Sequence, residues 1–441
     1  MEHIYRSLQD LEKKGEYVKV GLVGAGQMGS GLVSVAAQMP GFRITAVADL
    51  EIERAIRAYQ ESGIDENQIV VTEDPVYAEK AIVQKKVVVT KEAKIISHIP
   101  SIEAVVEGTG VPTTGAEVAL SCILSKKHVI MLNVETDVVV GLILKKLADN
   151  AGIVYTVSAG DEPGVIKELY NFARTLGFTV VTAGKGKNNP VNHYANPDDC
   201  KAEAEEKDMN PKMLVSFVDG SKTMIEMTEV ANATGLIPDI PGMHGPKVDV
   251  PDLQKVFVPR KDGGILSHSG VVDYSTGKVA PGVFVVIRTD SHIIRKDLKY
   301  YALGEGPYYL LYRPYHLCSI ETPLSVARAV LLGEHTVNTE RLVAEVVAIA
   351  KRDLEPGHVV DGIGGYDVFG RIYVTAEARE LQGIPLGLSQ GAIVKNRIKK
   401  SEPLTQDKVS LNKDTVLFQL WQIQNRFMQD MEITAGCGRE E

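Results

Sequence analysis

Residues 18–50 read VKVGLVGAGQMGSGLVSVAAQMPGFRITAVADL: an apolar run, a glycine turn, a stretch of small residues and a second apolar run. Short apolar runs bounded by glycine predict buried strands, and the small residues between them predict a helix. Two strands joined through a helix form a βαβ unit, in which the strands pair in parallel. This stretch therefore predicts an N-terminal parallel sheet covered by helices.

The pattern continues on both sides of this unit. An amphipathic helix is expected in the first 16 residues. Further strands are expected at 86–90, 104–110, 128–133 and 152–157, with helices at 113–126 and 137–151. Strands that alternate with helices predict a doubly wound α/β sheet of the Rossmann type, which we assign to residues 1–157.

Beyond residue 157 the pattern changes, and we expect a central α+β domain over 158–345 for catalysis and oligomerisation. Its expected elements are helices at 163–176, 211–232 and 322–332, a strand at 178–183, and paired strands at 282–290 and 308–314. Residues 346–441 are expected to form a small β-rich domain that ends in the apolar helix DTVLFQLWQIQNRF.

The composition of the chain argues against a nucleic-acid-binding protein, a disulfide-linked protein and a membrane protein. The chain has 441 residues, 44% of them hydrophobic, and a formal net charge of −9, which argues against a nucleic-acid partner. Four cysteines lie apart without zinc or CxxC spacing, which predicts reduced thiols: Cys122, Cys200, Cys318 and Cys437. With no run of about 20 apolar residues and a charged N-terminus, we expect a soluble cytoplasmic protein without membrane contact.

The glycine turn that follows the first strand reads Gly24-Ala25-Gly26-Gln27-Met28-Gly29. Between a strand and a helix this spacing predicts a dinucleotide site, with the pyrophosphate at the helix N-terminus. Asp49 ends the next strand, where its carboxylate can bind the adenosine ribose and favours NAD(H). Arg54 can instead receive a 2′-phosphate, so the residues leave the choice of cofactor open.

A second glycine turn, EGTGVPTTG at 107–115, falls where the other half of the sheet should approach the nicotinamide. Thr109 and the backbone of Gly110 are candidates for that contact. The alternative is a plain helix entry with Thr113 or Thr114 as N-cap.

Polar side chains in the central domain are candidates for substrate chemistry. Residues 182–194 read TAGKGKNNPVNHY, and we expect Lys185, with Lys187 as a second candidate, to lie in a loop where it either polarises a carbonyl or is simply solvated. One face of the helix at 219–233 carries side chains at helical spacing that line either a cleft or a solvated surface: Asp219, Lys222, Glu226, Glu229 and Asn232.

The segment YRPYHL adds Arg313, whose guanidinium suits a phosphate, and His316, which can carry a proton near neutral pH. A structural role is the alternative for His316. His244 and His268 stand in glycine-rich segments and are weaker candidates for a lid.

Six motifs occur in order: GLVGAGQMG, VVEGTGVP, KHVIMLNVETD, AGKG, DGSKTMIEMTEVANATGL and YRPYHL. Together they resemble the deoxyxylulose-phosphate reductoisomerase-like proteins, relatives of homoserine dehydrogenase with a small C-terminal domain of the SAF type. The resemblance covers residues 17–412. It implies a Rossmann domain, a catalytic domain, NADPH as hydride donor, and conversion of 1-deoxy-D-xylulose 5-phosphate to 2-C-methyl-D-erythritol 4-phosphate.

Two departures bear on this resemblance. Homoserine dehydrogenases usually have Ala-Asn-Lys after the fifth strand, whereas this chain has Asn133-Val134-Glu135. Reductoisomerases hold a divalent metal with an Asp-x-Glu pair, whereas Asp161 and Glu162 are adjacent here. Because neighbouring side chains of an extended segment point apart, joint chelation by this pair is doubtful, and the metal requirement stays open.

The leading hypothesis is an NADPH-dependent reductoisomerase that acts on a small phosphorylated substrate as a homodimer or homotetramer. NADP(H) follows from the resemblance, and NAD(H) is the other option. One alternative is a homoserine dehydrogenase-like enzyme for another small hydroxy or carbonyl substrate. A second is a non-catalytic, dinucleotide-binding regulatory protein.

Overall fold

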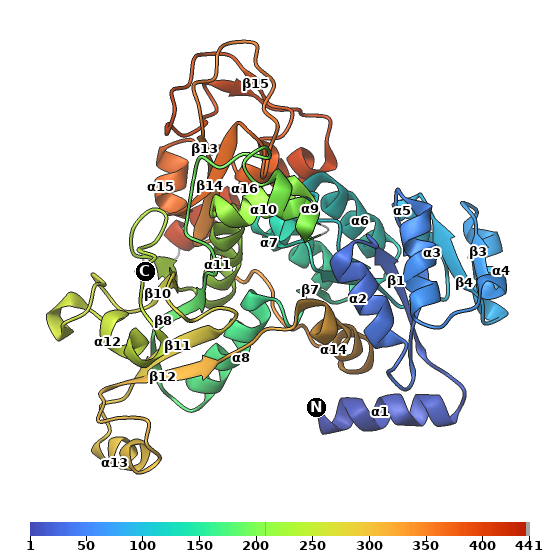
Figure 1. Ribbon diagram of the computed structural model, residues 1–441, viewed down its shortest axis with the longest axis horizontal. Helices are drawn as coiled ribbons and strands as arrows, with labels where there is room; N and C mark the ends of the chain where they lie inside the picture. The colour runs from blue at the N-terminus through green and yellow to red at the C-terminus, as the bar shows by residue number, and fades with distance from the viewer. Residues whose placement is uncertain (208, 438–441) are drawn as a thin grey trace. The chain divides into compact units, whose positions relative to one another are not determined.

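The computed structural model describes residues 1–207 and 209–437 as a mixed α/β protein (Figure 1). Its contacts group the chain into two compact units. The first contains Met1–Asp161, Leu317–Asn338 and the segment from Asp414, and the second contains Glu162–His316 and Thr339–Lys413. This grouping differs from the expected three domains because residues 317–338 and the last helix join the N-terminal part.

The first unit is built on a seven-stranded sheet with the order β3-β4-β2-β1-β5-β6-β7, in which every recorded pairing is parallel. The strands are β1 (Val18–Val23), β2 (Phe42–Ala48), β3 (Ile69–Val71), β4 (Val87–Thr90), β5 (Ala104–Glu107), β6 (His128–Met131) and β7 (Tyr155–Val157). The strand order reverses between β1 and β5, which confirms the doubly wound sheet.

The helices of this unit are α1 (Glu2–Lys13), α2 (Gln27–Ala36), α3 (Ile52–Glu61), α4 (Pro75–Val83), α5 (Ala93–His98), α6 (Pro112–Leu124), α7 (Val134–Ala151), α14 (Cys318–Leu332) and α16 (Val416–Cys437). Of these, α1, α2, α3 and α14 share an apolar core with the sheet, to which Leu22, Leu32 and Phe42 contribute fully buried side chains. Within this unit α14 packs on α2, and α16 packs on α6 and α7. No helix in the described ranges is long and apolar enough to span a membrane.

The second unit contains a five-stranded mixed sheet with the order β12-β11-β8-β10-β9. Its strands are β8 (Thr179–Gly186), β9 (Ile237–Pro238), β10 (Val271–Ser275), β11 (Val283–Arg288) and β12 (Tyr308–Arg313). The predicted pairing of the strands at 282–290 and 308–314 is confirmed by β11 and β12, which run antiparallel. Helices of this part are α8 (Glu162–Thr175), α9 (Lys201–Glu206), α10 (Pro211–Val218), α11 (Ser221–Thr234), α12 (Leu253–Val256) and α13 (His292–Tyr300).

The remainder of the second unit is rich in short strands and turns, as the sequence predicts for 346–412. It contains β13 (Ala344–Ala350), β14 (Val368–Val374), α15 (Thr375–Glu380), β15 (Ile393–Val394) and β16 (Val409–Ser410). β13 and β14 pair antiparallel, as do β15 and β16.

Two local expectations are wrong. The predicted helix at 211–232 is two helices, because the chain turns at Gly220, which has φ +89° and ends the regular hydrogen bonding after α10. The strand predicted at 178–183 continues to Gly186, so Lys185 lies within β8 and not in a loop.

Among the described residues, Cys122, Cys200 and Cys318 form no disulfide, which agrees with the predicted reduced thiols. The side chain of Cys437 lies outside the described residues.

Candidate functional site

The glycine turn between β1 and α2 has the shape that a dinucleotide needs. Gly24 has φ +97°, a backbone conformation that side chains rarely permit. A Cβ on Gly29 would lie 2.0 Å from the Gly24 carbonyl oxygen, so glycine is required for the helix to start this close to the strand. A Cβ on Gly26 would meet no protein atom within 4 Å, which leaves open space at the N-terminus of α2. The turn therefore fits a pyrophosphate.

Asp49 and Arg54 already have partners in the structure. The Asp49 carboxylate accepts the Ala25 N–H at 2.7 Å on one oxygen and the Glu51 N–H at 2.8 Å on the other. It thus holds the glycine turn against the end of β2, and each oxygen keeps a lone pair for a ribose hydroxyl. Arg54 is exposed and pairs with Glu51 at 2.9 Å. A 2′-phosphate would have to replace Glu51 as its partner.

The second glycine turn begins at a buried carboxyl that the sequence analysis did not select. Glu107 ends β5, and its Oε1 accepts the backbone N–H of Thr109 at 3.0 Å and the hydroxyl of Thr109. Gly110 follows with φ +67°. Helix α6 begins at Pro112 after Val111, so the alternative of Thr113 or Thr114 as N-cap is wrong. The contact of Thr109 and Gly110 with nicotinamide stays a prediction.

In the second unit, two carboxylates meet at the ammonium group of Lys185. Lys185 is buried on β8, and its ammonium binds Glu162 Oε1 and Glu226 Oε2. Glu162 opens α8, and Glu226 lies in the middle of α11. The alternative of a solvated lysine is therefore wrong, because Lys185 is buried on β8 between carboxylates that two helices supply. Its role at a substrate carbonyl stays a prediction.

The charges of Glu162, Lys185 and Glu226 act on one another and shift the pKa values of Lys185 and Glu226. Burial alone would lower the pKa of Lys185, but Glu162 and Glu226 outweigh it and raise that pKa above its ordinary value. Burial, and then repulsion from Glu162, raise the pKa of the Glu226 carboxyl. Lys185 is thus a permanent cation near neutral pH, next to a carboxyl that takes up a proton more readily than an exposed one.

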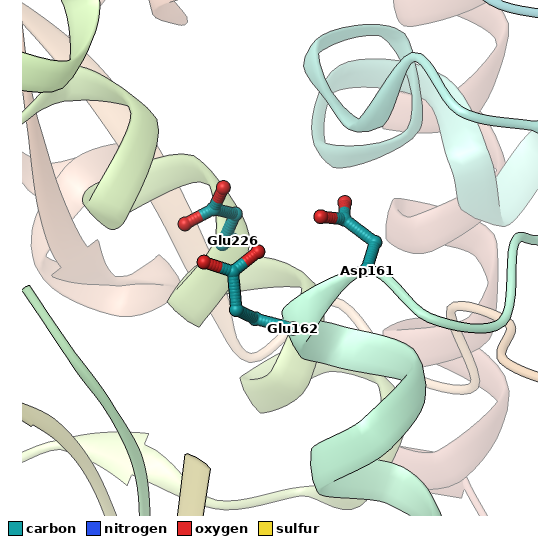
Figure 2. A group of neighbouring side chains, drawn as sticks. All are labelled: Asp161, Glu162 and Glu226. Carbon is teal, nitrogen blue, oxygen red and sulfur yellow. The ribbon is translucent and has the colours of Figure 1, made fainter. Parts of the chain in front are cut away.

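Asp161 directly precedes Glu162 in the chain, at the end of the first unit. Asp161, Glu162 and Glu226 each have one carboxylate oxygen within 4.8 Å of the others, and Figure 2 shows these carboxylates gathered together. Carboxylate oxygens suit a hard divalent cation. The ammonium of Lys185 already neutralises part of this negative charge, so a metal ion would compete with it.

Lys187 lies just beyond the end of β8 and is also buried. Its ammonium donates to the Phe217 carbonyl oxygen at 2.6 Å. Burial, and then the charge of Lys185, lower the pKa of Lys187 to about 8. The two lysines of the AGKGK segment therefore differ in kind: Lys185 stays charged, whereas Lys187 loses its proton close to physiological pH.

The polar face predicted over 219–233 is only partly formed. Asp219 lies at the break between α10 and α11, where it accepts the Ser221 N–H at 2.8 Å and pairs with the buried Lys351 at 2.8 Å. These contacts hold the carboxylate of Asp219 in place, and the catalytic role expected for it stays a prediction. Asn232 also has a structural role, since its Oδ1 accepts the N–H groups of Val343 and Ala344.

The other members of this face lie on α11 itself. Lys222 is half-buried, and its charge lowers the pKa of Glu226 against the effect of burial. Glu229 is fully buried one turn further along the helix. Their roles stay predictions.

His316 joins the Lys185 group through Glu162. Its Nε2 lies 3.6 Å from Glu162 Oε2, and its Nδ1 is 2.8 Å from the Pro281 carbonyl oxygen. Arg313 ends β12, where it lies 4.6 Å from the centroid of the Tyr315 ring and 3.5 Å from a carboxylate oxygen of Glu168. The predicted phosphate contact of Arg313 stays a prediction.

His244 and His268 gather around a buried carboxylate that the sequence analysis did not select. Asp239 lies 2.7 Å from His244 Nε2 and 3.6 Å from His268 Nε2. It also accepts the hydroxyl of Ser267. These bonds lower the pKa of Asp239 even though burial opposes them, so the carboxylate stays ionised and ties the two segments together.

Residues 160–322 match the family described as "Oxidoreductase DRL, catalytic domain". None of the curated proteins matches the chain. Similar solved structures include a homoserine dehydrogenase from Thiobacillus denitrificans, 14% identical over 88% of this chain and 98% of that one, with a TM-score of 0.45. A probable dehydrogenase from Thermotoga maritima is 13% identical over 72% of this chain and 90% of that one, with a TM-score of 0.42.

The family match agrees with the resemblance found in the sequence, and the matched segment, which resembles an oxidoreductase catalytic domain, contains Glu162, Lys185 and Glu226. The first unit supplies the doubly wound sheet and glycine turn of a dinucleotide-binding fold. The chain is accordingly an NAD(P)-dependent oxidoreductase.

Proposed function

We propose that this protein uses NADPH to reduce the carbonyl group of a small phosphorylated substrate. Within that class, the reductive isomerisation of 1-deoxy-D-xylulose 5-phosphate is the reaction that the six sequence motifs favour. The observation that supports the proposal is the buried Lys185 between Glu162 and Glu226, inside the segment that matches an oxidoreductase catalytic domain.

Carbonyl reduction needs a positive charge near the carbonyl oxygen and a source of one proton. Lys185 supplies a cation that is held on two sides and therefore needs no reorganisation during the reaction. The raised pKa of Glu226 suits it to exchange a proton with a substrate hydroxyl. The bound dinucleotide supplies the hydride to the carbonyl carbon.

An isomerisation must also deprotonate a neighbouring hydroxyl before the reduction. His316, linked to this group through Glu162, is the proposed relay for that proton because an imidazole ring can accept a proton on one nitrogen and donate one from the other. Arg313, at the end of β12, is proposed to hold the phosphate, since guanidinium groups bind oxyanions through two hydrogen bonds. A divalent cation at Asp161, Glu162 and Glu226 would add a Lewis acid to the same group.

NADP(H) is the proposed cofactor. Gly26 leaves open space for the pyrophosphate at the N-terminus of α2, and Asp49, which holds the same turn, is proposed to bind the ribose. Arg54 would bind the 2′-phosphate after it releases Glu51.

The test is NADPH oxidation by the purified full chain with a panel of sugar phosphates and small aldehydes, each with and without Mg²⁺ or Mn²⁺. The expected result is oxidation with 1-deoxy-D-xylulose 5-phosphate and formation of 2-C-methyl-D-erythritol 4-phosphate. Oxidation with a small aldehyde alone would replace the reductoisomerase with the homoserine dehydrogenase-like alternative. Tight dinucleotide binding without turnover on any member would favour the regulatory alternative.

A further inference from the structure

Glu107 occupies the position in the first unit where the strand order of the sheet reverses. It is the last residue of β5 and pairs with Val23, the last residue of β1. Gly24 follows Val23, and a Cβ on Gly24 would lie 3.0 Å from backbone atoms of Gly108. In open parallel sheets, ligands bind at the carboxyl ends of the strands beside this reversal. Glu107 therefore lies at the strand ends from which both glycine turns begin.

Hydrogen bonds tie this carboxyl to the second turn. Its Oε1 accepts both the N–H and the hydroxyl of Thr109. The Thr109 hydroxyl oxygen in turn accepts the Val111 N–H at 3.2 Å. Asn133 reaches the same turn from the end of β6, where its Nδ2 donates to the Val111 carbonyl oxygen at 3.1 Å. The conformation of residues 108–111 thus depends on Glu107.

The second oxygen, Oε2, is buried and has no hydrogen-bond partner among the described residues. Burial is the main cause that raises the pKa of Glu107 to about 7, and the bonds from Thr109 and the nearby amide of Asn133 oppose it. The titratable groups that act on Glu107 are Glu135 on α7 and the Cys122 thiol on α6. Because burial raises the pKa of Cys122 to about 12, that thiol stays neutral when Glu107 titrates.

We propose that Glu107 discriminates between the oxidised and the reduced nicotinamide, with its carboxylate form favouring the oxidised, positively charged ring. The proposal rests on the dinucleotide site of the proposed function. The oxidised ring carries one positive charge that the reduced ring lacks, and the rest of the cofactor is the same. A negative charge on Glu107 should therefore strengthen the binding of the oxidised ring and leave that of the reduced ring nearly unchanged. Glu107 acts through its charge and does not itself react.

The size of the effect follows from Coulomb's law. Two unit charges about 10 Å apart at an effective dielectric constant of about 20 change an equilibrium roughly tenfold. Ionisation of Glu107 should therefore strengthen NADP⁺ binding relative to NADPH binding by roughly that factor. Since the 2′-phosphate is common to both forms, its own titration cancels from the ratio of their dissociation constants.

The experiment measures the dissociation constants of NADP⁺ and NADPH by titration calorimetry at pH 6 and pH 8.5, without substrate. In the unaltered protein, the ratio Kd(NADPH)/Kd(NADP⁺) should rise roughly tenfold between the two pH values. Glu107→Gln keeps an acceptor for Thr109 but has no charge, so its ratio should not change with pH. The matched control is Glu103→Gln, an exposed residue directly before β5 at the end of the strand opposite Glu107, which should behave as the unaltered protein.

A ratio that is the same at both pH values in the unaltered protein would overturn the inference while leaving the proposed function intact, and needs no variant. A rise that persists in Glu107→Gln would also overturn it, because another group would then be titrating. Failure of both cofactor forms to bind at either pH would overturn the proposed function and the inference together.

Discussion

Replacement of Lys185 by methionine should destabilise the second unit strongly and abolish most of the activity. Methionine nearly matches lysine in length but carries no charge, so the change leaves the packing under α8 and α11 largely intact. It leaves Glu162 and Glu226 facing each other without their shared cation. Their side chains are 10% and 2% exposed, so water cannot compensate for the loss.

The magnitude follows from this burial. Removal of one partner from a buried ion pair typically costs about 3–5 kcal/mol, because the remaining charge stays desolvated. Part of that loss should return in the double variant Lys185→Met/Glu226→Gln, since one of the two repelling carboxylates is then neutral. We expect a coupling free energy of about 1–3 kcal/mol between the two sites. Turnover should fall on the order of a hundredfold or more in both variants, because both lack the fixed cation.

The assay is urea unfolding of the four proteins of this cycle, together with NADPH oxidation on the substrate identified by the panel. Lys207→Met is the matched control. Lys207 also pairs with a glutamate, Glu203, but the two side chains are 50% and 45% exposed. An exposed pair of this kind contributes no more than about 1 kcal/mol, and this control should keep full activity.

Two outcomes would refute the reasoning. A loss of stability in Lys185→Met no larger than in Lys207→Met would mean that water reaches the carboxylates. Turnover within roughly twofold of the unaltered protein would mean that the buried cation has no part in the chemistry.

Three further predictions concern the first unit. The pKa of Glu107 is raised from 4.5 to about 7, so the folded protein holds this proton more tightly than the unfolded chain. The free energy of unfolding should therefore fall by about 3 kcal/mol as the pH rises from 4.5 to 7. Urea unfolding of Glu107→Gln should not show this fall. Gly29→Ala should lower the free energy of unfolding in urea, because its methyl group would clash with the Gly24 carbonyl oxygen. Gly26→Ala should leave that free energy unchanged and weaken only dinucleotide binding, since its methyl group meets no protein atom. Arg54→Ala should weaken NADPH binding by roughly tenfold and leave NADH binding unchanged in fluorescence titrations, the effect of one lost charge-assisted contact.

The dinucleotide-binding sheet could be predicted from the sequence because its signals are local. Apolar runs and the turn from Gly24 to Gly29 lie within one continuous βαβ stretch, and the expected strands appear at nearly the expected positions. The C-terminal helix was predicted as an element, but not its place. Its Gln424 donates to the Val139 carbonyl oxygen, 285 residues earlier in the chain, and no local pattern reveals such a partner.

The Lys185 group shows the same limit at the candidate site. The lysine and Glu226 were both selected from the sequence, yet as members of a loop and of a separate helix face. Their contact joins residues 41 apart, and that of Lys185 with Glu162 joins residues 23 apart. Helical spacing also suggested that Asp219 shares a face with Glu226, but Gly220 interrupts the helix between them, and Asp219 pairs with Lys351 instead.

The opposite behaviour of Lys185 and Lys187 follows from where β8 ends. Side chains two residues apart in a strand point to the same face, so both lysines leave the sheet in one direction. Lys185 is still within the strand and lies under α8 and α11, each of which supplies a carboxylate. Lys187 lies one position past the strand and donates to the Phe217 carbonyl oxygen. The charges of Glu226 and Asp219 act on it as well, but they do not outweigh burial and the repulsion from Lys185. A segment that repeats one residue type thereby gives the site a cation that persists at all physiological pH values and an amine that titrates at about 8.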